Sequence, residues 1–185
     1  MNYEDLLQQH RLFKARYKSF IYDKVVEWIK RLDHLEVKSL LALVFHFHYN
    51  LVWYRESERG RNALSDLDEH AEKLCKAISD IGPLLKELEQ RYNDLLKLDL
   101  EDEYVGQSIK TAFDRLSKVC GITGASKILH VLCPNLFVMW DGPIRKHYRV
   151  DDYLTFLKRM QMELREAPDS YARKHGVDLS EARKR

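Results

Sequence analysis

The chain has 185 residues, of which 45% are hydrophobic and 11% aromatic, and its formal net charge is +2. A chain with this apolar content can bury a hydrophobic core, which excludes a wholly disordered protein. The small net charge gives no argument by itself for a nucleic-acid partner. Seven glycines and four prolines leave few turns for an all-β protein. Apolar residues recur at helical spacing, so we expect an all-α fold.

The three cysteines, Cys75, Cys120 and Cys133, lie far apart in the sequence. They form neither a CxxC pair nor a four-cysteine cluster, so we expect reduced thiols, no structural metal and no cofactor in a cytoplasmic protein. The first residues carry charges throughout, and no apolar run is long enough to span a bilayer. The sequence therefore predicts neither a signal peptide nor a membrane span.

Near the N-terminus, apolar residues over 3–21 and 25–32 predict one bent helix or two consecutive helices. Residues 37–54 are almost all apolar or aromatic, which is more than a one-faced surface helix needs. We expect a central, largely enclosed helix there. Residues 55–61 form a polar break.

Ser65 and Asp68 resemble a capping signal for the next helix, which should run to about Ile81. Gly82-Pro83 is expected to begin a new amphipathic helix. An acidic linker over residues 98–104 follows it. A weak boundary there would divide a single domain, residues 1–185, into lobes 1–98 and 105–167.

A helix over residues 109–119 leads into a cluster of small residues that breaks the helical pattern. An apolar run over 128–132 starts directly afterwards, so two helices should meet through a very short turn. Pro134 and Asn135 end the second helix, and residues 136–140 should form an extended connector. Asp141 then stands directly before another helical segment. The small residues of the turn are Gly121, Thr123, Gly124, Ala125 and Ser126.

The last predicted helix covers residues 152–167 and ends at Pro168. Residues 168–185 contain few apolar side chains and finish with basic ones. They are expected to form a basic tail, either mobile or folded as a short peripheral helix.

The charges are unevenly distributed along the chain. Residues 106–150 contain seven basic and two acidic residues, whereas residues 61–105 contain six and twelve. This asymmetry is compatible with a phosphate-facing surface, and equally with a positive lobe that packs against a negative one.

The turn and Asp141 together suggest chemistry on DNA. Backbone N–H groups at the start of a helix have no intrahelical partner and can hold a phosphate oxygen. An acid in a semi-apolar pocket can activate water as a general base or stabilise a positively charged sugar.

Residues 121–148 resemble the helix-hairpin-helix and the following aspartate of the base-excision DNA glycosylase superfamily. The likeness is best over residues 137–148, FVMWDGPIRKHY. It implies a glycosylase-like fold that binds double-stranded DNA in DNA repair and excises a damaged or mispaired base as an N-glycosylase, a hydrolase. Asp141 would take the place of the catalytic aspartate.

The chain departs from that family at two positions. Thr123 stands where a second glycine is expected, and Lys127 lies later than the lysine of lyase-competent members. The resemblance therefore implies a monofunctional enzyme, with Lys127 as the weaker catalytic candidate. Phe137 and Trp140 are candidates for a base pocket. The candidate DNA-binding residues are Gly121, Thr123, Gly124, Ser126, Lys127, Arg145, Lys146 and Arg149.

Other interpretations of the same residues stay open. Asp141 before Gly142-Pro143 is also an ordinary helix N-cap, and apolar residues on a connector are often core. The chain would then be a non-catalytic helix-hairpin-helix module that binds DNA or protein, or an unrelated helical protein. His46 and His48 point to opposite sides of a helix, so no metal site is expected there. The oligomeric state and the target base stay open.

Overall fold

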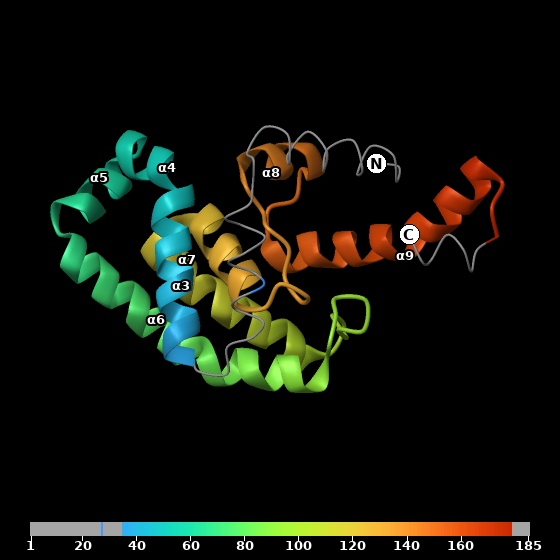
Figure 1. Cartoon of the computed structure of the whole chain (residues 1–185), viewed down its shortest axis with the longest axis horizontal. Helices are drawn as coiled ribbons and strands as arrows, with labels where there is room; N and C mark the ends of the chain where they lie inside the picture. Colours follow the sequence, from blue (N-terminus) through green and yellow to red (C-terminus); the bar gives the residue numbers. More distant parts are fainter. Residues whose placement is uncertain (1–26, 28–34, 179–185) are drawn as a thin grey trace.

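The computed structural model describes residue 27 and residues 35–178. Every regular element in these residues is an α-helix, which confirms the predicted all-α class. The helices predicted over residues 3–21 and 25–32 lie outside the described part, apart from residue 27. In chain order (Figure 1), the helices are α3 (Leu35–Tyr49), α4 (Leu51–Glu56), α5 (Glu58–Ser65), α6 (Leu67–Arg91), α7 (Glu103–Leu132), α8 (Gly142–Tyr148) and α9 (Tyr153–His175).

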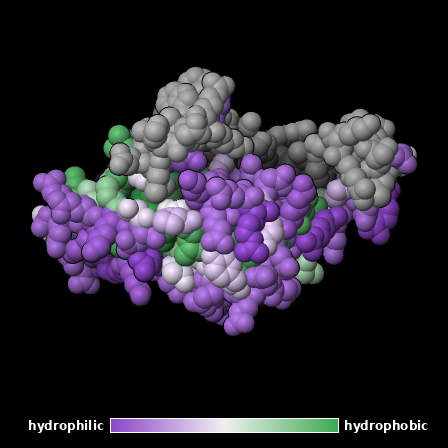
Figure 2. All heavy atoms as spheres, turned by 90° about the horizontal axis from the view of Figure 1, so that it is seen from below, coloured by the Kyte–Doolittle hydropathy of each residue, from purple (hydrophilic) through white to green (hydrophobic). Residues whose placement is uncertain are grey.

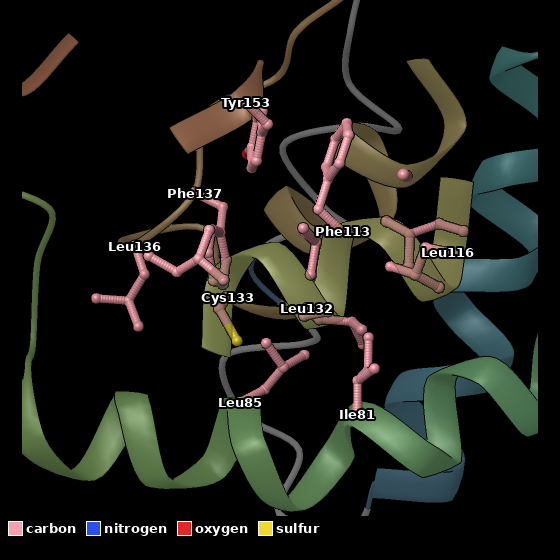
Figure 3. Packing of buried hydrophobic residues seen from close by; sticks show 14 of the residues in the cluster. Ile81, Leu85, Phe113, Leu116, Leu132, Cys133, Leu136, Phe137 and Tyr153 are labelled. Carbon is pink, nitrogen blue, oxygen red and sulfur yellow. The ribbon is translucent and has the colours of Figure 1, made fainter. Parts of the chain in front are cut away.

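The buried apolar side chains form one cluster that includes residues of α3, α6, α7 and α9. Ile81 and Leu85 of α6 point toward Leu132 and Cys133 at the end of α7 (Figure 3). The buried positions of α6 recur every three or four residues, which gives the helix one apolar face. Burial of each large apolar side chain on this face stabilises the fold by about 1.5–3 kcal/mol. The surface seen from the α6 side is mainly hydrophilic (Figure 2).

The single enclosed helix predicted over residues 37–54 is wrong in two respects. The segment divides into α3 and α4 at Asn50, whose side-chain amide donates to the His46 carbonyl oxygen at 2.9 Å. The Asn50 N–H also donates to the same carbonyl at 3.0 Å, so backbone hydrogen bonding continues across the junction. Leu40 and Val44 are also 60% and 59% exposed, so one face of α3 is open rather than enclosed.

The polar break predicted over residues 55–61 is partly helical, and the helix after it starts one residue later than its predicted cap implies. Residues 58–61 belong to α5, which Ser57 caps by accepting the Gly60 N–H at 2.9 Å. Asp66, not Ser65, caps α6 by accepting the Glu69 N–H at 3.1 Å. Serine and aspartate both favour the N-cap position, so the local sequence alone did not decide between Ser65 and Asp66.

The helix start predicted at Gly82-Pro83 is wrong, because α6 passes through Pro83 without ending. Gly82 is buried and Pro83 is exposed. The apolar face of the helix continues from Ile81 to Leu85 and Leu88 in the shared core. Packing of that face compensates for the N–H that proline lacks and for its clash with the preceding turn.

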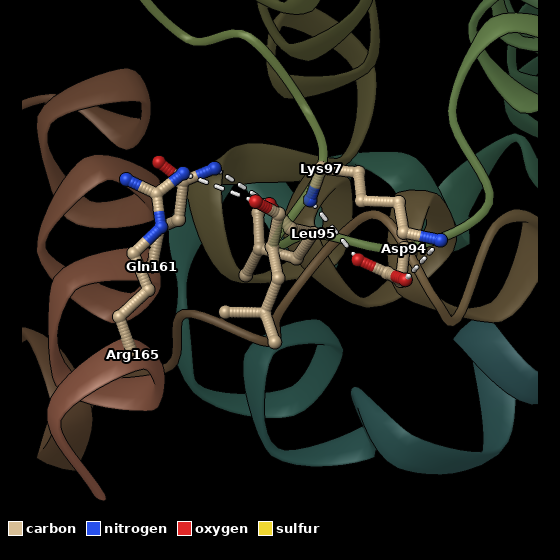
Figure 4. A network of polar contacts seen from close by, with 6 residues as sticks. Asp94, Leu95, Lys97, Gln161 and Arg165 are labelled. Carbon is tan, nitrogen blue, oxygen red and sulfur yellow. Dashed lines mark hydrogen bonds and ion pairs between the residues drawn. The ribbon is translucent and has the colours of Figure 1, made fainter. Parts of the chain in front are cut away.

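The segment after α6 is an irregular connection over residues 92–102, longer than the predicted linker. The Gln161 amide of α9 donates to the Leu95 and Leu98 carbonyl oxygens at 2.6 and 2.7 Å (Figure 4). Arg165 donates to the Leu96 carbonyl at 3.0 Å. These bonds attach the connection to α9. Division of the chain into two lobes stays a prediction.

The C-terminal helix does not end at Pro168 as predicted. α9 continues to His175, and Gly176 follows in the left-handed conformation with φ 63°. Residues 168–175 are therefore helical, whereas residues 179–185 of the predicted tail lie outside the described part. A glycine in this conformation is a common helix C-terminal signal.

Candidate functional site around Gly121 and Asp141

The backbone of α7 leaves the helical conformation at Gly121, where φ is 74° and ψ is 169°. Two helical segments meet here, as predicted, and Figure 1 shows α7 changing direction along its length. The break is confined to Gly121, however, and the other small residues expected in the turn are helical, namely Thr123, Gly124, Ala125 and Ser126. This combination of angles is accessible essentially to glycine alone. Gly121 and Thr123 are both half-buried.

Gly124 is buried beneath this turn. A Cβ atom there would lie 2.7 Å from His46 Cε1 and 2.9 Å from Cys120 Sγ. Only a residue without a side chain fits at such a separation, so close packing against α3 accounts for this glycine. Contact of Gly124 with a DNA phosphate stays a prediction.

Ser126 is fully buried and joins the second part of α7 to the connector. Its hydroxyl donates to the Thr123 carbonyl at 3.1 Å and accepts the Trp140 N–H at 2.9 Å. The connector is held again where His130 Nδ1 donates to the Phe137 carbonyl at 2.6 Å. Because the Trp140 backbone is tethered in this way, the position of the adjacent Asp141 is set by α7.

Asp141 begins α8 and caps it, because its Oδ1 accepts the Ile144 N–H at 3.1 Å. The carboxylate also lies close enough to Lys127 to affect that amine. Burial lowers the pKa of Lys127, and the negative charge of Asp141 acts in the opposite direction. The two catalytic candidates therefore belong to one electrostatic environment, although 14 positions separate them in the sequence.

Arg145 lies on α8 one turn after Asp141. Its guanidinium carbon is 5.1 Å from the centre of the Trp140 ring, in a cation–π contact. The Arg145 Nε and Trp140 Nε1 atoms are buried and have no hydrogen-bond partner in the described part of the chain. Lys146 is exposed on the same short helix, and Arg149 is exposed directly after it, as its C-cap. These basic residues therefore belong to the helix that Asp141 caps, or follow it directly.

The two candidates for a base pocket, Phe137 and Trp140, are each only 1% exposed. Trp140 stacks on Phe156 with ring centres 5.7 Å apart and contacts Phe113 and Tyr153 at its sides. Both residues contribute to the core in this structure, which is the alternative that the sequence left open. A role in base recognition stays a prediction.

A buried polar network next to the turn was missed from the sequence. His46 contacts Asn50 through Nδ1 at 2.8 Å and Tyr54 through Nε2 at 2.7 Å, and the Tyr54 hydroxyl contacts His70 Nε2 at 2.9 Å. The available signal was the spacing of four residues from His46 to Asn50 and from Asn50 to Tyr54, which places all three on one helical face.

Burial, followed by the charges of His70 and Lys127, lowers the pKa of His46 to about 3. The network also opposes protonation, since Asn50 donates to His46 Nδ1, which must then lack a proton. Burial and Lys73 lower the pKa of His70 as well. This region is therefore a neutral structural support for the turn at ordinary pH.

Within residue 27 and residues 35–178, no group of three or more His, Cys, Asp or Glu side chains is arranged to hold a metal ion. In the same residues no helix has the length and hydropathy of a bilayer-spanning segment. Comparison with protein-family models, curated proteins and solved structures found no match to this chain.

Proposed function

We propose that this protein binds double-stranded DNA and acts as a glycosylase-like protein, with Asp141 as the acid of a monofunctional base excision. The placement of Asp141 carries the proposal, because it stands at the start of α8 directly after the connector that Ser126 holds to α7, with Lys127 within reach of its charge. A carboxylate in this setting can activate water or stabilise the positive charge that develops on the sugar. Lys127 is the second catalytic candidate.

The surroundings of Asp141 support contact with an anionic backbone. Arg145 has no ion pair within the described residues, and its guanidinium lies over the Trp140 ring. Lys146 and Arg149 extend the positive charge over the exposed side of α8. An approaching phosphate would satisfy charges that the described part of the protein leaves unpaired.

The first test measures affinity for duplex DNA as a function of salt. We expect binding at low salt that weakens as salt rises, because phosphate contacts release bound counterions. Lys146→Gln should lower the salt slope by about one unit. Lys86→Gln, on the exposed side of α6, makes the same change away from the site and should have no effect. Affinity below detection at low salt would contradict the proposal.

The second test concerns catalysis and uses Asp141→Asn. Asparagine caps a helix about as well as aspartate, so this variant should stay folded and keep its DNA affinity. Cleavage of a panel of duplexes with damaged bases should fall at least a hundredfold, because the carboxylate is lost. Asp102→Asn is the matched control, since Asp102 caps α7 through the Val105 N–H at 2.9 Å. Unchanged turnover in Asp141→Asn would remove Asp141 from the mechanism.

A second candidate function follows from the hydrogen bond between Asp141 and the Ile144 N–H. In this alternative the aspartate serves only as a cap, and the protein is a non-catalytic module that binds DNA or protein. Salt-dependent DNA binding without cleavage of any damaged duplex would favour this function over the enzymatic one.

A further inference from the structure

We propose that a cavity between the first part of α7 and the start of α9 binds a small organic cation. The cavity has a volume of about 230 Å³. The cavity borders the proposed DNA site, since Trp140 and Ile122 line it, but none of the proposed catalytic or DNA-binding residues do. Its existence does not depend on DNA binding. Its walls are formed by Ile109, Lys110, Phe113, Asp114, Ser117, Ile122, Trp140, Asp151, Asp152, Tyr153 and Leu154.

The inner walls of the cavity are aromatic and aliphatic. Phe113 and Tyr153 stack with ring centres 4.4 Å apart, and Trp140 lies beside both. Tyr153 is held in place because its hydroxyl donates to the Val138 carbonyl at 2.7 Å. The Trp140 ring already stacks on Phe156 and contacts the Arg145 guanidinium, so Phe113 and Tyr153 are the rings left for a ligand. Aromatic rings attract cations through the negative potential of their faces, as they do in sites for quaternary ammonium groups.

The polar part of the wall selects the sign of the ligand charge. Three carboxylates, from Asp114, Asp151 and Asp152, outnumber the single ammonium of Lys110. The Asp152 carboxylate accepts the Thr155 N–H at 2.9 Å and so caps α9. The carboxylates of Asp114 and Asp151 have no hydrogen-bond or ion-pair partner among the described residues. They are therefore available to a positively charged ligand, and they oppose an anion such as phosphate.

The size of the cavity limits the ligand further. An apolar cavity of about 150 Å³ holds a benzene molecule, whereas sites for drug-sized ligands begin near 300 Å³. A volume between these values suits one compact head group with an apolar surface. An alkylated ammonium ion has this size, this surface and the required charge.

The test uses the full chain and choline as the probe, with 3,3-dimethyl-1-butanol as its neutral isostere. The chain has three tryptophans, and the buried Trp140 Nε1–H has no hydrogen-bond partner in the described residues. Its indole NMR signal, assigned with Trp140→Phe, reports on the wall of the cavity. We expect saturable, millimolar binding of choline that weakens with salt, and binding of the neutral alcohol that is at least tenfold weaker.

Three variants separate the cavity from general effects of charge. Asp114→Asn combined with Asp151→Asn should weaken choline binding about tenfold, because two attractive charges are removed. Ser117→Phe should abolish binding by filling the cavity while leaving the charges in place. Asp169→Asn, an exposed change on the far part of α9, should have no effect.

Several results would overturn the proposal. They are equal binding of choline and the alcohol, no saturation by choline at 100 mM (about a hundred times a millimolar Kd), and unchanged binding in the double variant of Asp114 and Asp151. Circular dichroism and the spread of NMR signals show whether each variant is folded. A failure of DNA binding leaves these outcomes unaffected, so the two proposals are tested separately.

Discussion

At the scale of single residues, Gly121 determines where the two parts of α7 meet. Its φ of 74° and ψ of 169° lie in a region that side chains strongly disfavour. No other described residue outside helix ends has a positive φ. The course of α7 after residue 121, and with it the place of Ser126 and the connector, follows from this one conformation.

Gly121→Ala should therefore destabilise the protein by about 1–3 kcal/mol, because alanine resists this backbone conformation. Urea denaturation followed by circular dichroism measures the effect. Gly142→Ala is the matched control, since no atom lies within 4 Å of a Cβ placed there and its φ is not positive. Equal stability of the two variants would show that the turn tolerates a side chain.

At the scale of elements, α6 shows packing that overrides a local stop signal. Pro83 removes one backbone hydrogen bond from the helix interior, yet the apolar face from Leu74 to Leu88 stays in register on both sides of it. Gly82, which precedes the proline, is buried. Because many core contacts favour a continuous helix, a single unfavourable residue does not end it.

Pro83→Ala should stabilise the protein by about 1–2 kcal/mol. Alanine restores an N–H donor and removes the clash with the preceding turn, although the gain is reduced by the greater freedom of the unfolded chain. The thermal midpoint should rise accordingly. Lys86→Ala, at another exposed position of α6, should change stability by less than about 0.5 kcal/mol. A lower midpoint for Pro83→Ala would mean that α6 needs the proline.

At the scale of the whole molecule, the His46 network connects three helices. It joins α3, α4 and α6, and His46 packs directly on the site of Gly124 in α7. The pKa of His46 is lowered from 6.5 to about 3 in the folded protein. Between pH 6.5 and about pH 3, His46 is protonated in the unfolded chain but not in the folded protein. The free energy of unfolding therefore falls as the pH falls through this range.

We therefore expect the free energy of unfolding to decrease on acidification below about pH 6.5, by about 1.4 kcal/mol per pH unit from His46. His70, whose pKa is also lowered, adds to this decrease. Urea midpoints between pH 7 and pH 5 measure this slope. His70→Gln keeps an acceptor for the Tyr54 hydroxyl but cannot titrate, so its slope should be smaller than that of the unchanged protein. The same slope in both proteins would exclude a contribution from His70.

The sequence alone determined the features that depend on neighbouring residues. These are the all-α class, the break at Gly121, the connector after Pro134 and the start of α8 at Asp141. Glycine conformation and helix capping are local effects, so single-chain patterns reveal them.

Only the tertiary structure decided which patterns were overridden and which side chains meet. It continued α6 through Pro83 and α9 through Pro168, and it buried Gly124 and Ser126 in packing. It also brought Lys127 to Asp141, where their charges interact. These outcomes depend on contacts between segments far apart in the chain, and their energies exceed the local preferences that a sequence pattern records.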